Sequence, residues 1–178
     1  AEVFAVKVFD RRLSASIEAL VAGIGWAAAH DADLINLSLG TANRDHTAAL
    51  RSAVVRAAAA GALVVAAGTH DGVAYLPGSL DGVVRVELDW SCLRLAVEVA
   101  SGAGAGDTVC RASGYPRPVP GVPSERNLKG ISFAVANVTG VLARELTGGS
   151  RPSRRRRYAK SVPPNVMCPG GSPCGIES

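Results

Sequence analysis

The chain has 178 residues, enough for about one domain of ordinary size. Hydrophobic residues make up 48% and charged residues 19%, a balance that allows a buried core and excludes a chain disordered throughout. Because only 4% of the residues are aromatic, that core must consist mainly of Ala, Val and Leu. The longest apolar runs, 57–68 and 131–143, are shorter than the roughly 18 residues of a membrane span, so we expect no membrane partner.

The formal net charge of +4 is concentrated at the C-terminal end. Residues 151–178 hold six basic residues and one acid, whereas residues 1–150 hold 13 basic and 14 acidic residues. We therefore expect residues 1–150 to form the folded domain and residues 151–178 to be a solvated, disordered tail. Such a tail can attract nucleic acid or an acidic protein, but it lacks interleaved aromatic residues, which makes nucleic acid an unlikely partner.

The four cysteines, Cys92, Cys110, Cys168 and Cys174, do not follow the paired C-x₂₋₄-C spacing of zinc sites, so we assign no metal and no cofactor. A Cys92–Cys110 or Cys168–Cys174 disulfide would fit an exported protein, and four reduced thiols fit a reducing compartment equally well. The first eight residues lack the charged region and cleavage site of a signal peptide. The localisation therefore stays unknown.

Apolar spacing predicts strands alternating with helices. Strands are expected at 4–9, 33–39, 62–67 and 83–88, and a loop rich in Gly, Pro and Ser is expected at 101–129. The first helix is expected to begin after Ser14 or Ser16, and the second to lie around Leu50–Ala57 and stop at Gly61. The third is expected over 133–146, after Gly130. Strands that alternate with helices in this way indicate βαβ units. The predicted fold class is α/β: three layers, with a mostly parallel sheet and helices on both faces.

Four segments, in order, resemble the subtilisin-like serine peptidases. They are GIGWAAAHDADLINLSLG at 23–40, VVAAGTHDG at 64–72, the stretch 75–88, and GISFAVANVTG at 130–140. The resemblance covers residues 3–147 and implies that Ser132 occupies the position of the catalytic nucleophile. It also implies that Ser38-Leu39-Gly40 pairs with an extended peptide, that Ala66-Ala67-Gly68 walls the specificity pocket, and that Thr69 stands at the oxyanion position. Such grooves bind peptides by strand addition, independently of catalysis.

The sequence also departs from the family pattern. The family's catalytic Asp and His lie in segments that precede the strand resembled by residues 5–8, so neither is present in residues 1–178. Thr69 stands where the family has an asparagine donor, and Ile131, Ala136 and Asn137 also differ. A serine hydroxyl needs an adjacent base. Of the three histidines, His30 and His46 are expected at the surface, which leaves His70 as a low-probability substitute base.

The absent catalytic-Asp strand lies, in the family, between the strands resembled by residues 5–8 and 34–39. Its loss would expose two rows of unpaired backbone groups. We expect either that these two strands pair directly or that another chain supplies the missing strand.

Three functions compete. The leading hypothesis is a pseudopeptidase that binds a peptide or protein without cleaving it. The second is an active endopeptidase whose Asp and His come from another segment or chain. The third is binding of nucleic acid or an acidic partner through the Arg-rich tail.

Overall fold

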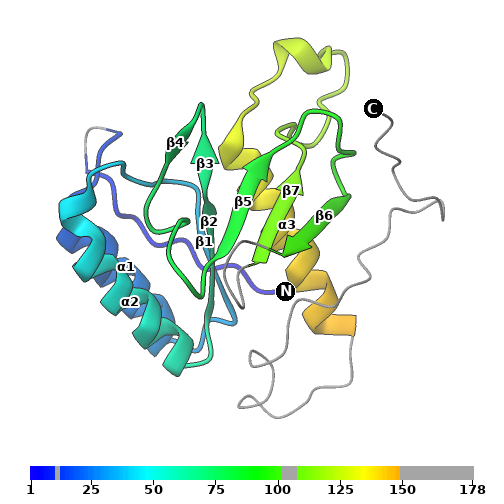
Figure 1. Ribbon diagram of the computed structural model, residues 1–178. Helices are drawn as coiled ribbons and strands as arrows, with labels where there is room; N and C mark the ends of the chain where they lie inside the picture. The colour runs from blue at the N-terminus through cyan, green and yellow to red at the C-terminus, as the bar shows by residue number, and fades with distance from the viewer. Residues whose placement is uncertain (11–12, 102–107, 149–178) are drawn as a thin grey trace.

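A computed structural model describes residues 1–10, 13–101 and 108–148. Along the chain the helices and strands are α1 (Ile17–Ala29), β1 (Leu34–Leu37), η1 (Arg44–His46), α2 (Thr47–Ala59), β2 (Leu63–Ala67), β3 (Thr69–His70), β4 (Val73–Ala74), β5 (Val84–Leu88), β6 (Val97–Ser101), β7 (Thr108–Ala112), η2 (Ser124–Arg126) and α3 (Ile131–Gly148) (Figure 1). None of these helices is long and apolar enough to cross a membrane. The predicted tail, 151–178, lies outside the described residues.

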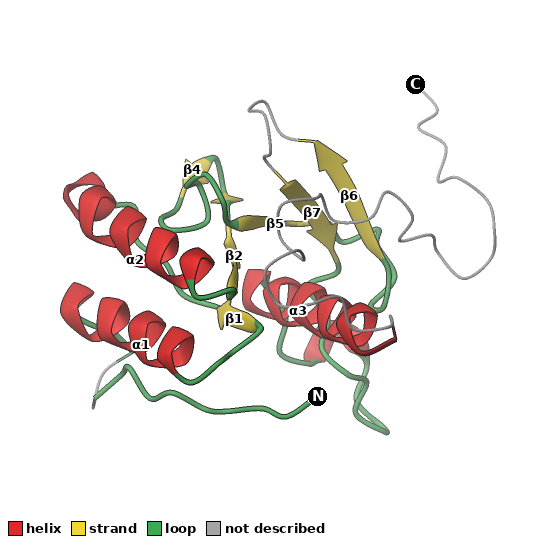
Figure 2. Cartoon of the chain, turned by 90° about the horizontal axis from the view of Figure 1, so that it is seen from below, coloured by secondary structure: helices red, strands yellow, loops and turns green. Residues whose placement is uncertain are grey.

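The main sheet has five strands in the order β1-β2-β5-β7-β6. All neighbouring strands run parallel except β6, which pairs antiparallel with β7. Helices α1 and α2 cover one face of the sheet, and α3 covers the other (Figure 2). The predicted three-layer α/β fold is therefore confirmed.

The core lies in two layers, one on each side of the sheet. Side chains from α1 and α2 meet Val64 and Ala66 of β2, whereas α3 packs against Val65 of the same strand. All three β2 residues are buried, which explains why the strand reads as a continuous apolar run rather than an alternating one. The short Ala and Val side chains let the helices approach closely without aromatic residues.

The predicted helix boundaries agree with the structure. Ser16 caps α1, because its hydroxyl accepts a hydrogen bond from the Ala19 N–H at 3.2 Å. Helix α2 ends before Gly61, whose φ of +89° favours glycine. Helix α3 was predicted to stop at Gly148–Gly149, and in the described part of the chain it extends to Gly148.

Two predicted elements are wrong. Residues 4–9 form no strand; they lie as an extended segment near α1, where Val6 and Val8 approach Gly23. An extended segment becomes a strand only when a neighbour completes its hydrogen-bond ladder, and β1 pairs with β2 alone. The predicted loop at 101–129 contains β7, and the preceding β6 was not predicted either.

The structure therefore does not contain the direct pairing expected between residues 5–8 and β1. Within residues 1–10, 13–101 and 108–148, no strand lies on the outer edge of β1. Among the described strands, the sheet edge is therefore open at β1, the strand that leads into the predicted peptide-binding segment.

Replacement of Leu50 by alanine tests the α1–α2 layer. Leu50 is fully buried on α2, so Leu50→Ala should lower the free energy of unfolding by about 2–5 kcal/mol. Val55 on the same helix is 61% exposed, and Val55→Ala should change it by no more than about 0.5 kcal/mol. Urea unfolding followed by circular dichroism measures both. Equal losses in the two variants would contradict the helix placement.

Candidate peptidase-like site

The candidate nucleophile, Ser132, lies in the first turn of α3 and is exposed. Gly130 precedes the helix with a φ of +146°, a conformation that L side chains rarely adopt, and its N–H donates to Gly114 O at 2.9 Å. The helix start is thereby fixed to the chain that leaves β7. The first backbone N–H groups of a helix have no partner within it, so this end presents positive partial charge beside Ser132.

Ser132 and Ser38 form a reciprocal pair of hydrogen bonds. Ser132 Oγ donates to Ser38 O at 3.2 Å, and Ser38 Oγ donates to Ser132 O at 3.2 Å. The two residues are 94 positions apart in the sequence. The structure therefore brings the predicted nucleophile together with the first residue of the predicted peptide-binding segment.

Two further residues, not identified from the sequence, extend this contact. Thr139 Oγ1 on α3 lies 3.0 Å from Asn36 Oδ1 and 2.8 Å from Val135 O, two acceptors for one proton, and Asn36 Nδ2 donates to Ser38 Oγ at 3.1 Å. The signal that pointed to them was weak: Asn36 and Thr139 are polar residues within motifs that otherwise read as a buried strand and a helix. Together with Ser38 and Ser132 they form a polar network between β1 and α3, which we call the β1–α3 network.

The segment Ser38-Leu39-Gly40 is held in place by the residue that follows it. Thr41 and Leu76 exchange two backbone hydrogen bonds, of 3.0 and 2.8 Å. A side chain at Gly40 would place its Cβ 2.8 Å from Leu76 O, so glycine is required there. Ser38 and Gly40 are exposed, as a peptide-binding edge requires.

Ala66 and Ala67 are the last two residues of β2, and Gly68 directly follows the strand. Gly68 N donates to Val86 O at 2.9 Å, and Gly68 O accepts from Tyr75 N at 2.7 Å. The aliphatic stem of Arg85 packs directly against Gly68, and the Arg85 Nε donates to Gly78 O at 3.2 Å. The predicted wall of the specificity pocket, Ala66-Ala67-Gly68, is therefore flanked on one side by the partly buried side chain of Arg85.

Thr69 and His70 lie in a small hairpin beyond β2. Thr69 pairs with Ala74, and the His70 Nε2 lies 3.5 Å from an Asp71 carboxylate oxygen. An open pocket of about 520 Å³ has these two residues in its wall; it is lined by Thr69, His70, Asp71, Glu87, Leu88 and Trp90. Ser132 does not line this pocket. The oxyanion role of Thr69 and the base role of His70 stay predictions.

None of the three histidines, all of which the structure describes, forms a hydrogen bond with Ser132. His30 Nδ1 lies 2.8 Å from Trp26 O and His46 Nε2 lies 3.5 Å from Asn43 Nδ2. His30 is exposed, as predicted, and His46 is half-buried. The hydroxyl of Ser132 thus has a carbonyl acceptor in place of an imidazole.

The predicted alternatives for the cysteines are resolved in part. Cys92 and Cys110 are both reduced and are not bridged to each other. Cys110 is fully buried in the α3 layer, and this burial raises the pKa of its thiol to about 12. Cys168 and Cys174 lie outside the described residues.

The model of the Subtilase family matches residues 1–170. The chain belongs to the subtilase family. Among curated relatives, it is 35% identical to the minor extracellular protease Epr of Bacillus subtilis (strain 168) over 113 residues, which are 61% of this chain and 16% of that protein. It is 31% identical to the alkaline elastase YaB of Bacillus sp. (strain YaB) over 144 residues, 80% of this chain and 37% of that one.

Solved structures agree on the fold. The prenylagaramide maturation protease PagA superposes with a TM-score of 0.58 at 23% identity, over 83% of this chain and 57% of that protein. Sphericase gives a TM-score of 0.54 at 20% identity, over 80% and 53%. This subtilase chain therefore spans no more than about half of the relatives that it matches.

A threonine-to-valine pair tests the β1–α3 network. Thr139→Val keeps the side-chain shape but removes the hydroxyl that contacts Asn36, so the free energy of unfolding should fall by about 1 kcal/mol. Thr147, near the end of the same helix, bonds only to backbone oxygens of α3, and Thr147→Val should change it by less than about 0.5 kcal/mol. Urea titration measures both. The reverse order of the two losses would contradict a stabilising role for the network.

Proposed function

We propose that this chain binds an extended peptide along Ser38–Gly40 and Ala66–Gly68 and does not hydrolyse it unaided. The observation that carries the proposal is the hydrogen bond from Ser132 Oγ to Ser38 O. A serine hydroxyl becomes nucleophilic when a base accepts its proton. A backbone carbonyl can accept the hydrogen bond but is far too weak a base to take the proton.

Peptide binding is supported by the exposed backbone of the same segment. Thr41 directs both its N–H and its carbonyl to Leu76. In an extended segment successive residues direct these groups to opposite sides, so those of Ser38 and Gly40 face away from Leu76. The Ser38 carbonyl already accepts a hydrogen bond from Ser132 Oγ there, and a carbonyl oxygen can accept a second one. A peptide that pairs there gains main-chain hydrogen bonds whatever its sequence.

A second candidate is peptide-bond hydrolysis with a base and an acid supplied from elsewhere, and the open edge of β1 favours it. Ser132 contacts the residue immediately after β1, so a strand added at that edge would run beside the hydroxyl. In that arrangement Ser132 would attack the carbonyl, and the start of α3 would stabilise the oxyanion. The added strand can come from another part of a longer polypeptide or from a separate chain.

Casein turnover and binding separate the two candidates. The chain should bind fluorescein-labelled β-casein, seen as a rise in anisotropy, without releasing small fragments over a day. Because Ser132 is not activated, Ser132→Ala should bind equally well, and a fluorophosphonate probe should label neither protein. Turnover or labelling that disappears in Ser132→Ala would show instead that the chain is an active peptidase.

Amide chemical shifts would locate the peptide. Acetyl-tetraalanine amide, which has no charges, should move the amide signals of Ser38, Gly40 and Gly68. The amide of Arg56, on α2, serves as the control and should not move. Absence of any shift at Ser38 and Gly40 at millimolar peptide would contradict binding at this segment.

A further inference from the structure

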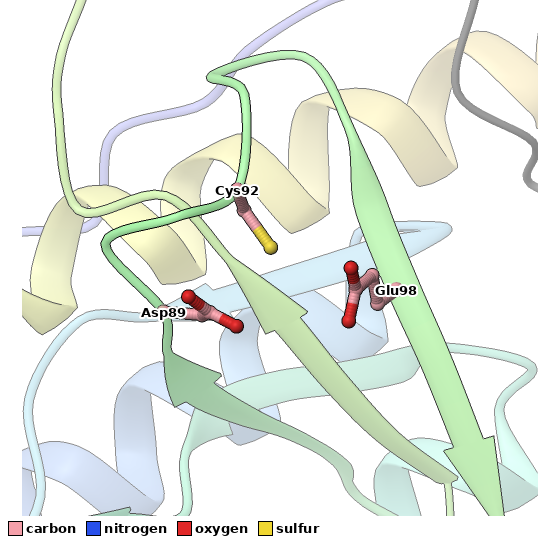
Figure 3. Close-up of side chains that lie close together, drawn as sticks. All are labelled: Asp89, Cys92 and Glu98. Carbon is pink, nitrogen blue, oxygen red and sulfur yellow. The ribbon is translucent and has the colours of Figure 1, made fainter. Parts of the chain in front are cut away.

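Three side chains with metal-binding atoms converge beside the carboxyl end of β5. Asp89 directly follows β5, Cys92 lies in the loop after it, and Glu98 is the second residue of β6. The Cys92 sulfur and one carboxylate oxygen from each acid all lie within 4.8 Å of one another. Figure 3 shows the three side chains pointing into one space. All three residues are half-buried.

The charges around this cluster leave room for a cation. Asp89 Oδ1 accepts hydrogen bonds from Ser91 Oγ at 2.6 Å and Ser91 N at 2.8 Å, and these bonds lower the pKa of Asp89. Within the described residues, the carboxylate of Glu98 has no hydrogen bond or ion pair. Arg111 is paired with Glu98 across the ladder, but its Nε lies 3.8 Å from Glu87, and its charge contributes to the lowered pKa of Asp89. Two carboxylates this close repel each other unless positive charge lies between them.

The donor set indicates which cation fits. Ca²⁺ and Mg²⁺ prefer sites made of oxygen alone, whereas a thiolate with two carboxylates suits Zn²⁺. Zinc bonds of about 2.0–2.3 Å place tetrahedral donors roughly 3.3–3.5 Å apart, so the cluster must contract by about 1 Å. The long side chain of Glu98 can supply this movement by rotation about its own bonds.

We propose that Asp89, Cys92 and Glu98 bind a Zn²⁺ ion, with water as the fourth ligand. Binding forms one Zn–S and two Zn–O bonds and displaces water from the hydrated ion. The thiol proton of Cys92 passes to solvent, so the thiol gives up its hydrogen bond to Asp89 and its contact with Arg111 O, 3.9 Å away. The ion would join the loop after β5 to β6, a connection that carries the exposed side chains of Trp90, Leu93 and Leu95.

This site goes beyond the proposed function and shares no residue with Ser38, Ser132 or the rest of the β1–α3 network. Its role is structural. Because the ion would bind the folded chain and not the unfolded one, it should raise the melting temperature in proportion to the logarithm of its concentration.

A zinc titration tests the site. The starting protein is the full chain with Cys168→Ser and Cys174→Ser, which removes the thiols outside the described residues. Calorimetry with Zn²⁺ at pH 7.5 should give one ion per chain, and Cys92→Ser or Glu98→Gln should each weaken binding by about tenfold or more. Glu125→Gln, in η2, serves as the matched control and should bind as the starting protein does.

Cobalt provides a readout that depends on sulfur. Co²⁺ should produce thiolate charge-transfer absorption in the starting protein and in Glu125→Gln, but not in Cys92→Ser. Ca²⁺ should bind much more weakly than Zn²⁺. The proposal is overturned if Zn²⁺ binds the starting protein and Cys92→Ser equally, if Co²⁺ gives no such absorption, or if no ion binds. Circular dichroism of Glu98→Gln confirms that a loss of binding is not a loss of folding.

Discussion

The contact between the end of β1 and the first turn of α3 organises the candidate site. Ser38 and Ser132 exchange two hydrogen bonds, and Asn36 and Thr139 add a third link about two turns of helix further on. These elements lie on different layers of the fold and belong to opposite halves of the chain (Figure 2). Without this contact, the proposed peptide-binding segment and the predicted nucleophile would not be held together.

The open edge of β1 determines what this contact does. In a sheet, an edge strand offers unpaired N–H and carbonyl groups to any neighbour. Here that strand runs directly into Ser38, so whatever pairs with β1 also becomes a neighbour of Ser132. In the proposed hydrolytic arrangement, the chemistry of the hydroxyl would depend on the partner of β1 as well as on α3. This is why family membership and catalytic competence are separate questions for a chain that spans about half of its relatives.

Much of the fold could be predicted from local patterns. The Ser16 cap, the stop at Gly61 and the fully apolar β2 each depend on neighbouring residues only, and all three predictions were confirmed. The failures depend on partners that are distant in sequence. Residues 4–9 have the composition of a strand, but no described strand pairs with them. The strand β7 lies in a glycine-rich stretch, and it forms because its backbone pairs with β5 and β6. The same limit applies to the site: a motif located Ser132, but no local pattern indicated that Asn36 would connect it to Thr139.

The hairpin formed by β3 and β4 gives Thr69 and His70 contacts of their own. The backbone of Thr69 is committed to Ala74, and the imidazole of His70 is drawn to the carboxylate of Asp71. Both residues line a pocket that Ser132 does not line. A general base must lie within hydrogen-bond reach of the hydroxyl whose proton it takes, and the imidazole of His70 instead contacts Asp71. Neither residue forms a hydrogen bond with Ser132 within the described residues, so activation of the Ser132 hydroxyl needs a base that these contacts do not supply.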